Sequence, residues 1–253
     1  MLWGRQRPEE MRRRASIVAG LAIAVSAAVA MVSAAPAPTG TLKGRIKLNG
    51  PDPGNKVIRM GMDPMCAKMW AGKKPGPVDE VVITSNDGGL MNAFVKLDGS
   101  FPGTPVPAQP VLLDQKACFY HPRVVGARVE QVLRIKNDDH LLHNVHSSSS
   151  HRNSFNFGQP QAGISSDFKL KDEEMLKISC DVHRWMTAWI GVVDHPYFAV
   201  SGADGSFVID NVPPGKRTVS VWHERFGRLT KAVDVTAGGA TTVEFVYPAA
   251  AKS

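Results

Sequence analysis

Short stretches in which apolar and polar residues alternate recur along most of this chain. In residues 41–48, Leu42, Ile46 and Leu48 alternate with charged residues, and the stretch ends at a turn signal that begins at Asn49. A period of two is typical of a half-buried β-strand. Comparable segments bounded by Gly, Pro, Asn or Asp predict strands at 81–84, 93–97, 111–114, 131–137, 176–180, 188–193, 206–209 and 218–222.

Helix signals are few in comparison. One short helix is expected within residues 63–71, and residues 99–110, which hold four prolines, are expected to form a loop. Strands separated by turns at short intervals predict an all-β fold built from sandwiches. A chain of 253 residues can bury one large core or two modest ones.

The N-terminus has a different composition from the rest of the chain. Three arginines at 12–14 precede an apolar run at 17–31 and then small residues up to Ala34. This order predicts a secretory signal peptide at 1–34, and hence a periplasmic or extracellular protein. The apolar run is shorter than the ~20 residues that a membrane-spanning helix needs. An uncleaved anchor remains the alternative, and otherwise no stable membrane insertion is expected.

The net charge of the chain excludes few classes of binding partner. The formal net charge is +7, and without the five arginines and two glutamates of the leader it is +4. The basic residues are spread along the chain, so no nucleic-acid partner is predicted. A mildly basic surface can at most steer an acidic partner, and an ordinary solvated surface is the favoured interpretation.

The most informative motif is Cys180-x-x-His183-x-x-Met186. Leu176 and Ile178 alternate with polar residues, which makes Cys180 the last inward-facing residue of a strand. The following turn can then bring residues 180, 183 and 186 to one point. A second strand, at 131–137, leads into a segment that contains His143. One thiolate, two imidazoles and one thioether suit a single copper ion, whereas zinc has little use for a thioether.

The identity of the upstream histidine is less constrained. Four histidines crowd this region, namely His140, His143, His146 and His151. His143 is preferred because Asn144 follows it, and His146 is the second candidate. The alternative to a metal site is a sandwich in which these side chains merely pack.

With Leu142 to His146 upstream of the Cys180 motif, the sequence resembles the cupredoxins, and the short ligand loop is most similar to that of amicyanin. The resemblance implies a Greek-key sandwich, here at residues 81–195. It also implies a blue (type 1) copper site that cycles between Cu(I) and Cu(II).

Carried over by position, the resemblance makes His143, Cys180 and His183 equatorial ligands and Met186 the axial ligand. Asn144 would tie the two ligand segments together by hydrogen bonds. Electrons from a redox protein partner would enter at an exposed edge of His183. Arg184 and Leu142 stand where many relatives have proline, which removes no ligand.

The C-terminal region has a second pattern. Turns at 202–205 and 212–215, each followed by a strand, are similar to those of carboxypeptidase regulatory-like, or transthyretin-like, β-sandwich modules. This resemblance implies a smaller module at 196–250. About 55 residues are few for an independent sandwich, so the first strand, within the segment 35–80, is expected to pair with the C-terminal strands. Trp222, His223 and Tyr247 keep glycan binding open as a minor alternative.

Two cysteines remain if Cys180 binds metal. In an oxidising compartment Cys66 and Cys118 can form a disulfide. The alternative is that Cys66 joins the methionine-rich stretch 60–69 in a soft Cu(I) site, although methionines also fill gaps in cores.

The predicted function is that of an exported one-electron carrier and not of an enzyme. Serines 147–150 beside His146 and His151 lack an oriented acid, and copper oxidases and reductases need a second copper. An adaptor with structural copper and a copper-delivery protein are the alternatives.

Overall fold

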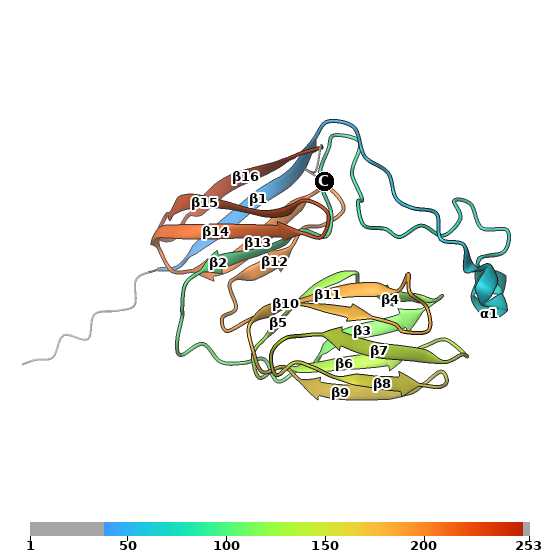
Figure 1. The fold of residues 1–253 in the computed structure, drawn as a ribbon. Coiled ribbons are helices and arrows are strands. Elements are labelled where there is room, and N and C mark those ends of the chain that lie inside the picture. The colour runs from blue at the N-terminus through green and yellow to red at the C-terminus, as the bar shows by residue number, and fades with distance from the viewer. Residues whose placement is uncertain (1–37, 250–253) are drawn as a thin grey trace, which may run out of the picture. The chain divides into compact units, whose positions relative to one another are not determined.

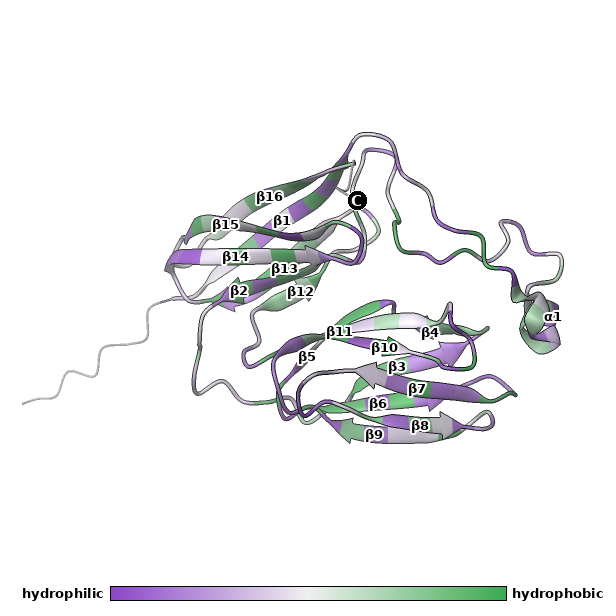
Figure 2. Cartoon of the chain, viewed as in Figure 1, coloured by the Kyte–Doolittle hydropathy of each residue, from purple (hydrophilic) through white to green (hydrophobic). Residues whose placement is uncertain are grey.

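The computed structural model describes residues 38–249, so the predicted signal peptide lies outside the described residues. The fold is all-β, with two sandwiches and one short helix (Figure 1). Within the described range, no helix is long and apolar enough to cross a membrane. Figure 2 shows apolar and polar positions alternating along strands of both sandwiches.

The first of the two sandwiches, named here the site sandwich, consists of two sheets. One sheet has the order β5-β11-β10-β7-β8 and the other the order β4-β3-β6-β9. Its strands are β3 (Val111–Lys116), β4 (Phe119–His121), β5 (Val124–Arg128), β6 (Val132–Asn137), β7 (His143–Ser148), β8 (Asn156–Gln159), β9 (Ser165–Lys169), β10 (Glu174–Ser179) and β11 (Thr187–Val193).

The second, named the terminal sandwich, has sheets of order β13-β1-β16 and β12-β2-β14-β15. Its strands are β1 (Gly40–Asn49), β2 (Phe94–Asp98), β12 (Phe198–Val200), β13 (Ser206–Val212), β14 (Gly215–His223), β15 (Gly227–Val235) and β16 (Ala240–Pro248). Between β1 and β2 the chain forms η1 (Met60–Met62) and α1 (Pro64–Trp70). The likeness of this sandwich to carboxypeptidase regulatory-like modules stays a prediction.

The first strand pairs as the sequence predicts. β1 runs antiparallel to β13 and parallel to β16, so it lies in the middle of its sheet. Leu42 and Ile46 on β1 are fully buried in the same core as Phe245 of β16. Residues on both sides of the site sandwich therefore build the terminal sandwich.

β2 lies in a different place from the one expected. The segment 81–195 is predicted as the copper domain, but β2 pairs with β12 and β14 of the terminal sandwich. Val95 and Leu97 are fully buried in the core of that sandwich, which explains why β2 belongs there. The strands of the site sandwich accordingly run from Val111 to Val193.

β7 was expected only as a segment that follows a strand. His143, Val145 and Ser147 face inward and are buried, while Asn144 and His146 on the other face are not. Two of the three inward residues are polar, which hides the alternation that would indicate a strand. This register decides which histidine can reach the interior.

A buried histidine in the terminal sandwich predicts how stability depends on pH. His223 is 1% exposed, and burial lowers its pKa to about 4 from 6.5. Between these values the unfolded chain binds a proton that the folded chain excludes, so stability falls as pH falls from 6.5 to 4. The loss is at most about 3 kcal/mol.

Urea unfolding of wild-type protein and His223→Phe across this range measures the effect. The variant is expected to lose the part of the pH dependence that His223 causes. His151→Gln, which removes an exposed histidine, should leave the wild-type slope in place. Equal slopes for His223→Phe and wild type would contradict the assignment.

Candidate metal centre

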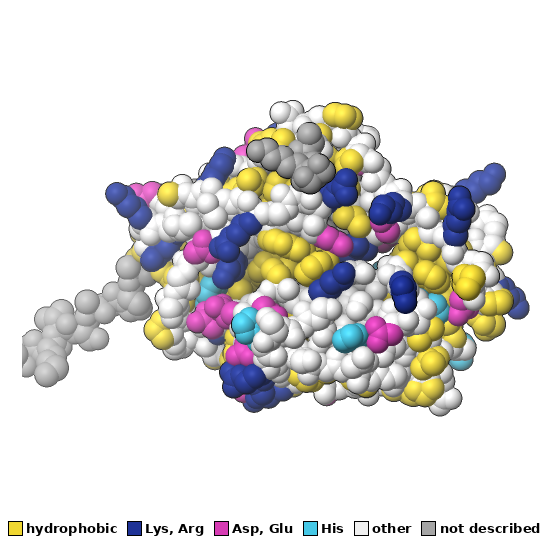
Figure 3. Space-filling model, in the orientation of Figure 1, with side chains coloured by type: hydrophobic (Ala, Val, Ile, Leu, Met, Phe, Trp, Pro, Cys, Tyr) yellow, Lys and Arg dark blue, Asp and Glu magenta, His cyan; other side chains and the backbone are white. Residues whose placement is uncertain are grey.

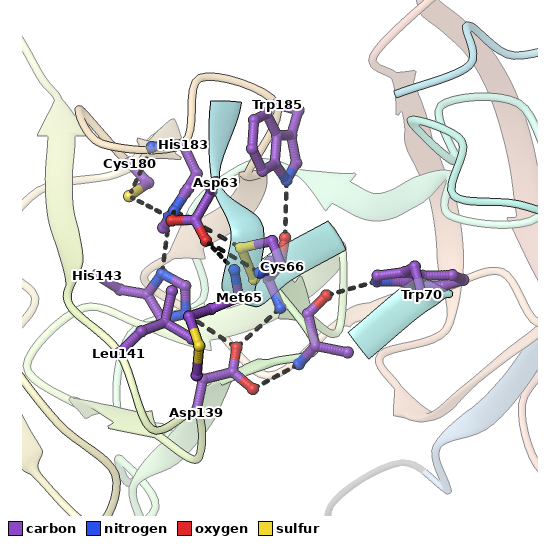
Figure 4. Close-up of a disulfide and its surroundings, with 12 residues drawn as sticks. Asp63, Met65, Cys66, Trp70, Asp139, Leu141, His143, Cys180, His183 and Trp185 are labelled. Atoms are coloured by element: carbon purple, nitrogen blue, oxygen red, sulfur yellow. Dashed lines mark hydrogen bonds and ion pairs between the residues drawn. A yellow bond between two sulfur atoms is a disulfide. The ribbon is translucent and has the colours of Figure 1, made fainter. Parts of the chain in front are cut away.

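Three predicted ligands meet at one end of the site sandwich. His143 begins β7, Cys180 directly follows β10, and His183 lies in the loop before β11. The Nδ1 atoms of His143 and His183 lie 3.0 Å apart, and the Sγ of Cys180 lies 3.8 Å from the Nδ1 of His183. One ligand atom from each residue falls within 4.8 Å of the others, and all three side chains are buried. The arrangement is drawn in Figure 4.

The other nitrogen of each imidazole faces a carboxylate. The Nε2 of His143 lies 2.9 Å from Asp139 Oδ2, and the Nε2 of His183 lies 2.8 Å from Asp63 Oδ2. A carboxylate accepts only, so each Nε2 carries the proton and donates it. The lone pair of each neutral ring is then on Nδ1, which points to the shared space. Such outer contacts fix the tautomer and orientation of metal-binding histidines.

The groups around the Cys180 sulfur favour its thiolate form. It accepts backbone N–H groups from Asn144 and His183, each at 3.3 Å. Burial opposes ionisation, but the imidazoles of His143 and His183, which donate to the sulfur from Nδ1 when they are protonated, together with those two N–H groups, bring the pKa of Cys180 down to about 6. At neutral pH this side chain is therefore the anion that binds metals.

Met186 closes the ligand loop through its backbone. Its N–H donates to the carbonyl of His183 at 2.8 Å, and its carbonyl accepts from the N–H of Cys180 at 3.3 Å. The Met186 side chain is fully buried and belongs to the same apolar cluster as Cys180. Its role as a fourth donor stays a prediction.

Asn144 links the two ligand segments. Its Oδ1 accepts the backbone N–H of Asp181 at 3.1 Å, and its Nδ2 donates to Asn156 Oδ1 at 2.6 Å. The segment that carries His143 is thereby held to the loop that carries His183. These are hydrogen bonds of the kind that the resemblance to cupredoxins implies for Asn144.

The structure does not bring His146 to this group. Its side chain lies on the opposite face of β7, where its Nδ1 is 3.0 Å from Asp181 Oδ1 at an exposed position. His140 and His151 are also exposed. Of the four crowded histidines, only His143 faces Cys180.

Cys66 and Cys118 form a disulfide, with Cα atoms 5.8 Å apart. The Sγ of Cys66 lies 3.6 Å from the Nε2 of His183, so the disulfide lies on the outer side of this imidazole.

The methionine-rich stretch contains both buried and exposed side chains. Met60 is buried in the core, whereas Met62 is 94% exposed and Met65 is 48% exposed.

One expectation is wrong at this site. His183 was expected to present an exposed edge, but its exposed fraction is 1%. Residues 60–70, named here the cap, cover its Nε2 side with Asp63 and Cys66. An electron cannot enter through a bare imidazole edge at this position.

Two residues of the site, Asp63 and Asp139, were not predicted from the sequence. Asp139 lies four residues before His143, but an acidic residue in a polar turn is an ordinary surface feature. Asp63 is 120 residues from His183, and nothing in the sequence pattern connects them. Only the arrangement of the cap could reveal this contact.

The donor set fits copper better than the alternatives. Two imidazole nitrogens and one thiolate in a buried site form the equatorial set of blue-copper centres, and structural zinc sites add a fourth strong donor. Two further groups of candidate ligands, Asp63-Cys66-His183 and Cys118-Asp139-His143, each depend on a disulfide cysteine. Their sulfur is not a thiolate while the disulfide is intact.

No protein-family model matches the sequence, and a comparison with curated proteins finds no match. Among solved structures, the chain is similar to a purple cupredoxin from Nitrosopumilus maritimus, with 22% identity over 32% of this chain and 97% of that chain and a TM-score of 0.28. A Cu(I) structure of an amicyanin mutant has 14% identity over 39% of this chain and 97% of that chain, with a TM-score of 0.30.

A copper-containing nitrite reductase from Thermus scotoductus SA-01 has 15% identity over 37% of this chain and 24% of that chain, with a TM-score of 0.30. Similarities at this level carry no argument about function. What the site can do depends on its own side chains.

Proposed function

We propose that this protein is an exported electron carrier that holds one copper ion at His143, Cys180 and His183, with Met186 as a weak axial donor. The observation that carries the proposal is the convergence of two Nδ1 atoms and one Sγ in a buried space, from two separated segments of the chain. A bound copper would supply a one-electron couple between Cu(I) and Cu(II).

The residues around the ligands are arranged to keep them still. Both imidazoles are fixed at Nε2 by carboxylates, and the thiolate is fixed by two backbone N–H groups. The strands β10 and β11 pair from Glu174 opposite Val192 to Ser179 opposite Thr187, which supports the loop between them. Ligands that move little between two oxidation states suit electron transfer rather than substrate binding.

We propose a carrier rather than an enzyme. Among the residues that the structure describes, the other groups of candidate ligands share His143 and His183 with the first. They offer no separate position for a substrate-binding copper. The partner is then expected to be another redox protein. Figure 3 shows basic and acidic side chains mixed over the face in view, in keeping with a partner of modest charge.

Copper delivery is the second candidate. Met62 and Met65 expose thioethers on the cap, close in sequence to Asp63 at the site. Thioethers prefer Cu(I), so such a surface could receive or donate the reduced ion.

Electrochemistry of the copper-loaded protein distinguishes the two functions. A carrier is expected to give a reversible one-electron wave and to retain one copper per chain after repeated cycles in the presence of a Cu(I) chelator. Copper loss to the chelator after each reduction would support delivery. Absence of any reversible wave from fully loaded protein would contradict the carrier proposal.

A further inference from the structure

The outer partner of His183 comes from a distant part of the chain. Asp63 precedes α1, and the cap to which it belongs lies between β1 and β2 of the terminal sandwich. Its Oδ2 is 2.8 Å from the Nε2 of His183, as Figure 4 shows. The site therefore depends on a residue outside the sandwich that supplies the ligands.

We propose that Asp63 is a positioning residue, which holds the His183 imidazole with Nδ1 toward Cys180 and closes the site, and that the Cys66–Cys118 disulfide keeps it in place. The importance of this for copper rests on the proposed function. The closure itself is a property of the copper-free protein and can be measured without metal.

Asp63 is itself immobilised by the helix that it begins. Its Oδ1 accepts the backbone N–H groups of Met65 and Cys66 at 2.9 and 3.0 Å, as an N-cap residue does. Pro64 follows at the first helical position, which favours a helix start here. One carboxylate oxygen is thus committed to the helix, and the other is left for His183.

The cap is fastened to the same turn that supports the other imidazole. Asp139, which holds His143, also accepts the backbone N–H groups of Ala117 and Cys118 at 2.7 and 2.8 Å. Cys118 is bonded to Cys66 in the cap, and Trp70 at the end of α1 donates to the carbonyl of Ala117 at 2.9 Å. A continuous set of bonds therefore joins the two carboxylates that orient the two histidines.

The contact with Asp63 has two consequences for His183 as a ligand. A carboxylate that accepts the Nε2 proton makes the imidazole a stronger donor, which favours Cu(II) over Cu(I) and lowers the reduction potential. It also prevents the ring from turning away, because rotation would break a bond at a buried position. Removal of this type of outer contact typically costs about 10- to 100-fold in metal affinity.

Asp63→Asn is the sharpest variant. The asparagine Oδ1 can still cap α1, but its Nδ2 would place a donor against the donor Nε2 of His183. The control is Asp167→Asn, which removes a carboxylate from an exposed ion pair with Arg134 outside the group. Asp63→Ser is a second variant that keeps a capping oxygen and is too short to reach His183. Circular dichroism checks the fold of each variant.

The first measurement uses copper-free, oxidised protein and follows reaction of the Cys180 thiol with an aromatic disulfide reagent. Asp63→Asn and Asp63→Ser are expected to react at least about 10-fold faster than wild type and Asp167→Asn. The second uses copper-loaded protein, in which the Asp63 variants are expected to release copper to a chelator at least about 10-fold faster. They should also have a higher reduction potential.

The outcomes separate this inference from the proposed function. Failure of wild type to bind copper, with a faster thiol reaction in the Asp63 variants, would overturn the carrier and leave the closure standing. Wild-type thiol reactivity, copper release and potential in both Asp63 variants would overturn the positioning role and leave the carrier standing.

Discussion

Replacement of Cys180 by serine is expected to abolish the intense visible band that the proposed copper–thiolate site should give, and to weaken copper binding by more than about 100-fold, the upper end of the loss for an outer contact alone. The band arises from charge transfer between a thiolate and Cu(II), and Cys180 is the free cysteine of the described chain. The other two cysteines are joined in the disulfide and cannot replace it. A serine hydroxyl is neutral at pH 7 and offers a hard oxygen to a site built from soft donors. Visible spectra and copper titrations of both proteins measure the effect.

A matched pair of histidine variants tests the same site. His143→Gln is expected to lose the band, whereas His146→Gln is expected to keep it, because His143 lies on the inward face of β7 with Cys180 and His183, and His146 lies on the other face. The two residues are three positions apart and differ in the face of the strand that they occupy. Equal loss in both variants, or an intact band in Cys180→Ser, would contradict this ligand assignment.

The double variant Cys66→Ala and Cys118→Ala is expected to lose about 4 kcal/mol of unfolding free energy. The disulfide joins residues 52 positions apart, and the chain-entropy model gives this value for a loop of that length at 25 °C. Alanine is chosen because Cys66 lies within α1, where alanine supports a helix. Urea unfolding under oxidising conditions measures the difference between variant and wild type.

Reductant provides the control for this prediction. Wild-type protein unfolded in the presence of a strong reductant should approach the stability of the double variant. The variant itself should show no effect of reductant. A difference below about 1 kcal/mol between oxidised wild type and the variant would mean that the cap adds little to the fold.

Local patterns predicted the parts of the structure that depend on near neighbours. Leu176, Ile178 and Cys180 alternate with polar residues, and the structure buries all three. The loop after Cys180 brings His183 back to it within three residues, so spacing alone could predict this contact. The pairing of β1 with the C-terminal strands could also be predicted, because a module of about 55 residues has too little core of its own.

The other features of the fold and the site depend on contacts between residues far apart in the sequence, which a local pattern does not record. The apolar face of β2 would suit either sandwich, and only its burial beside β14 decides between them. Asp63 resembles any helix N-cap in sequence, and its second contact with His183 arises only when the cap folds over the ligand loop. The expectation of an exposed His183 edge failed for the same reason.

X-ray absorption spectroscopy at the copper edge of the loaded protein tests the central claim most directly, because it counts the donor atoms around the metal. We predict one short copper–sulfur distance and two imidazole nitrogens in wild type, and no short copper–sulfur distance in Cys180→Ser. A first shell of nitrogen and oxygen donors alone in wild-type protein would contradict this ligand set.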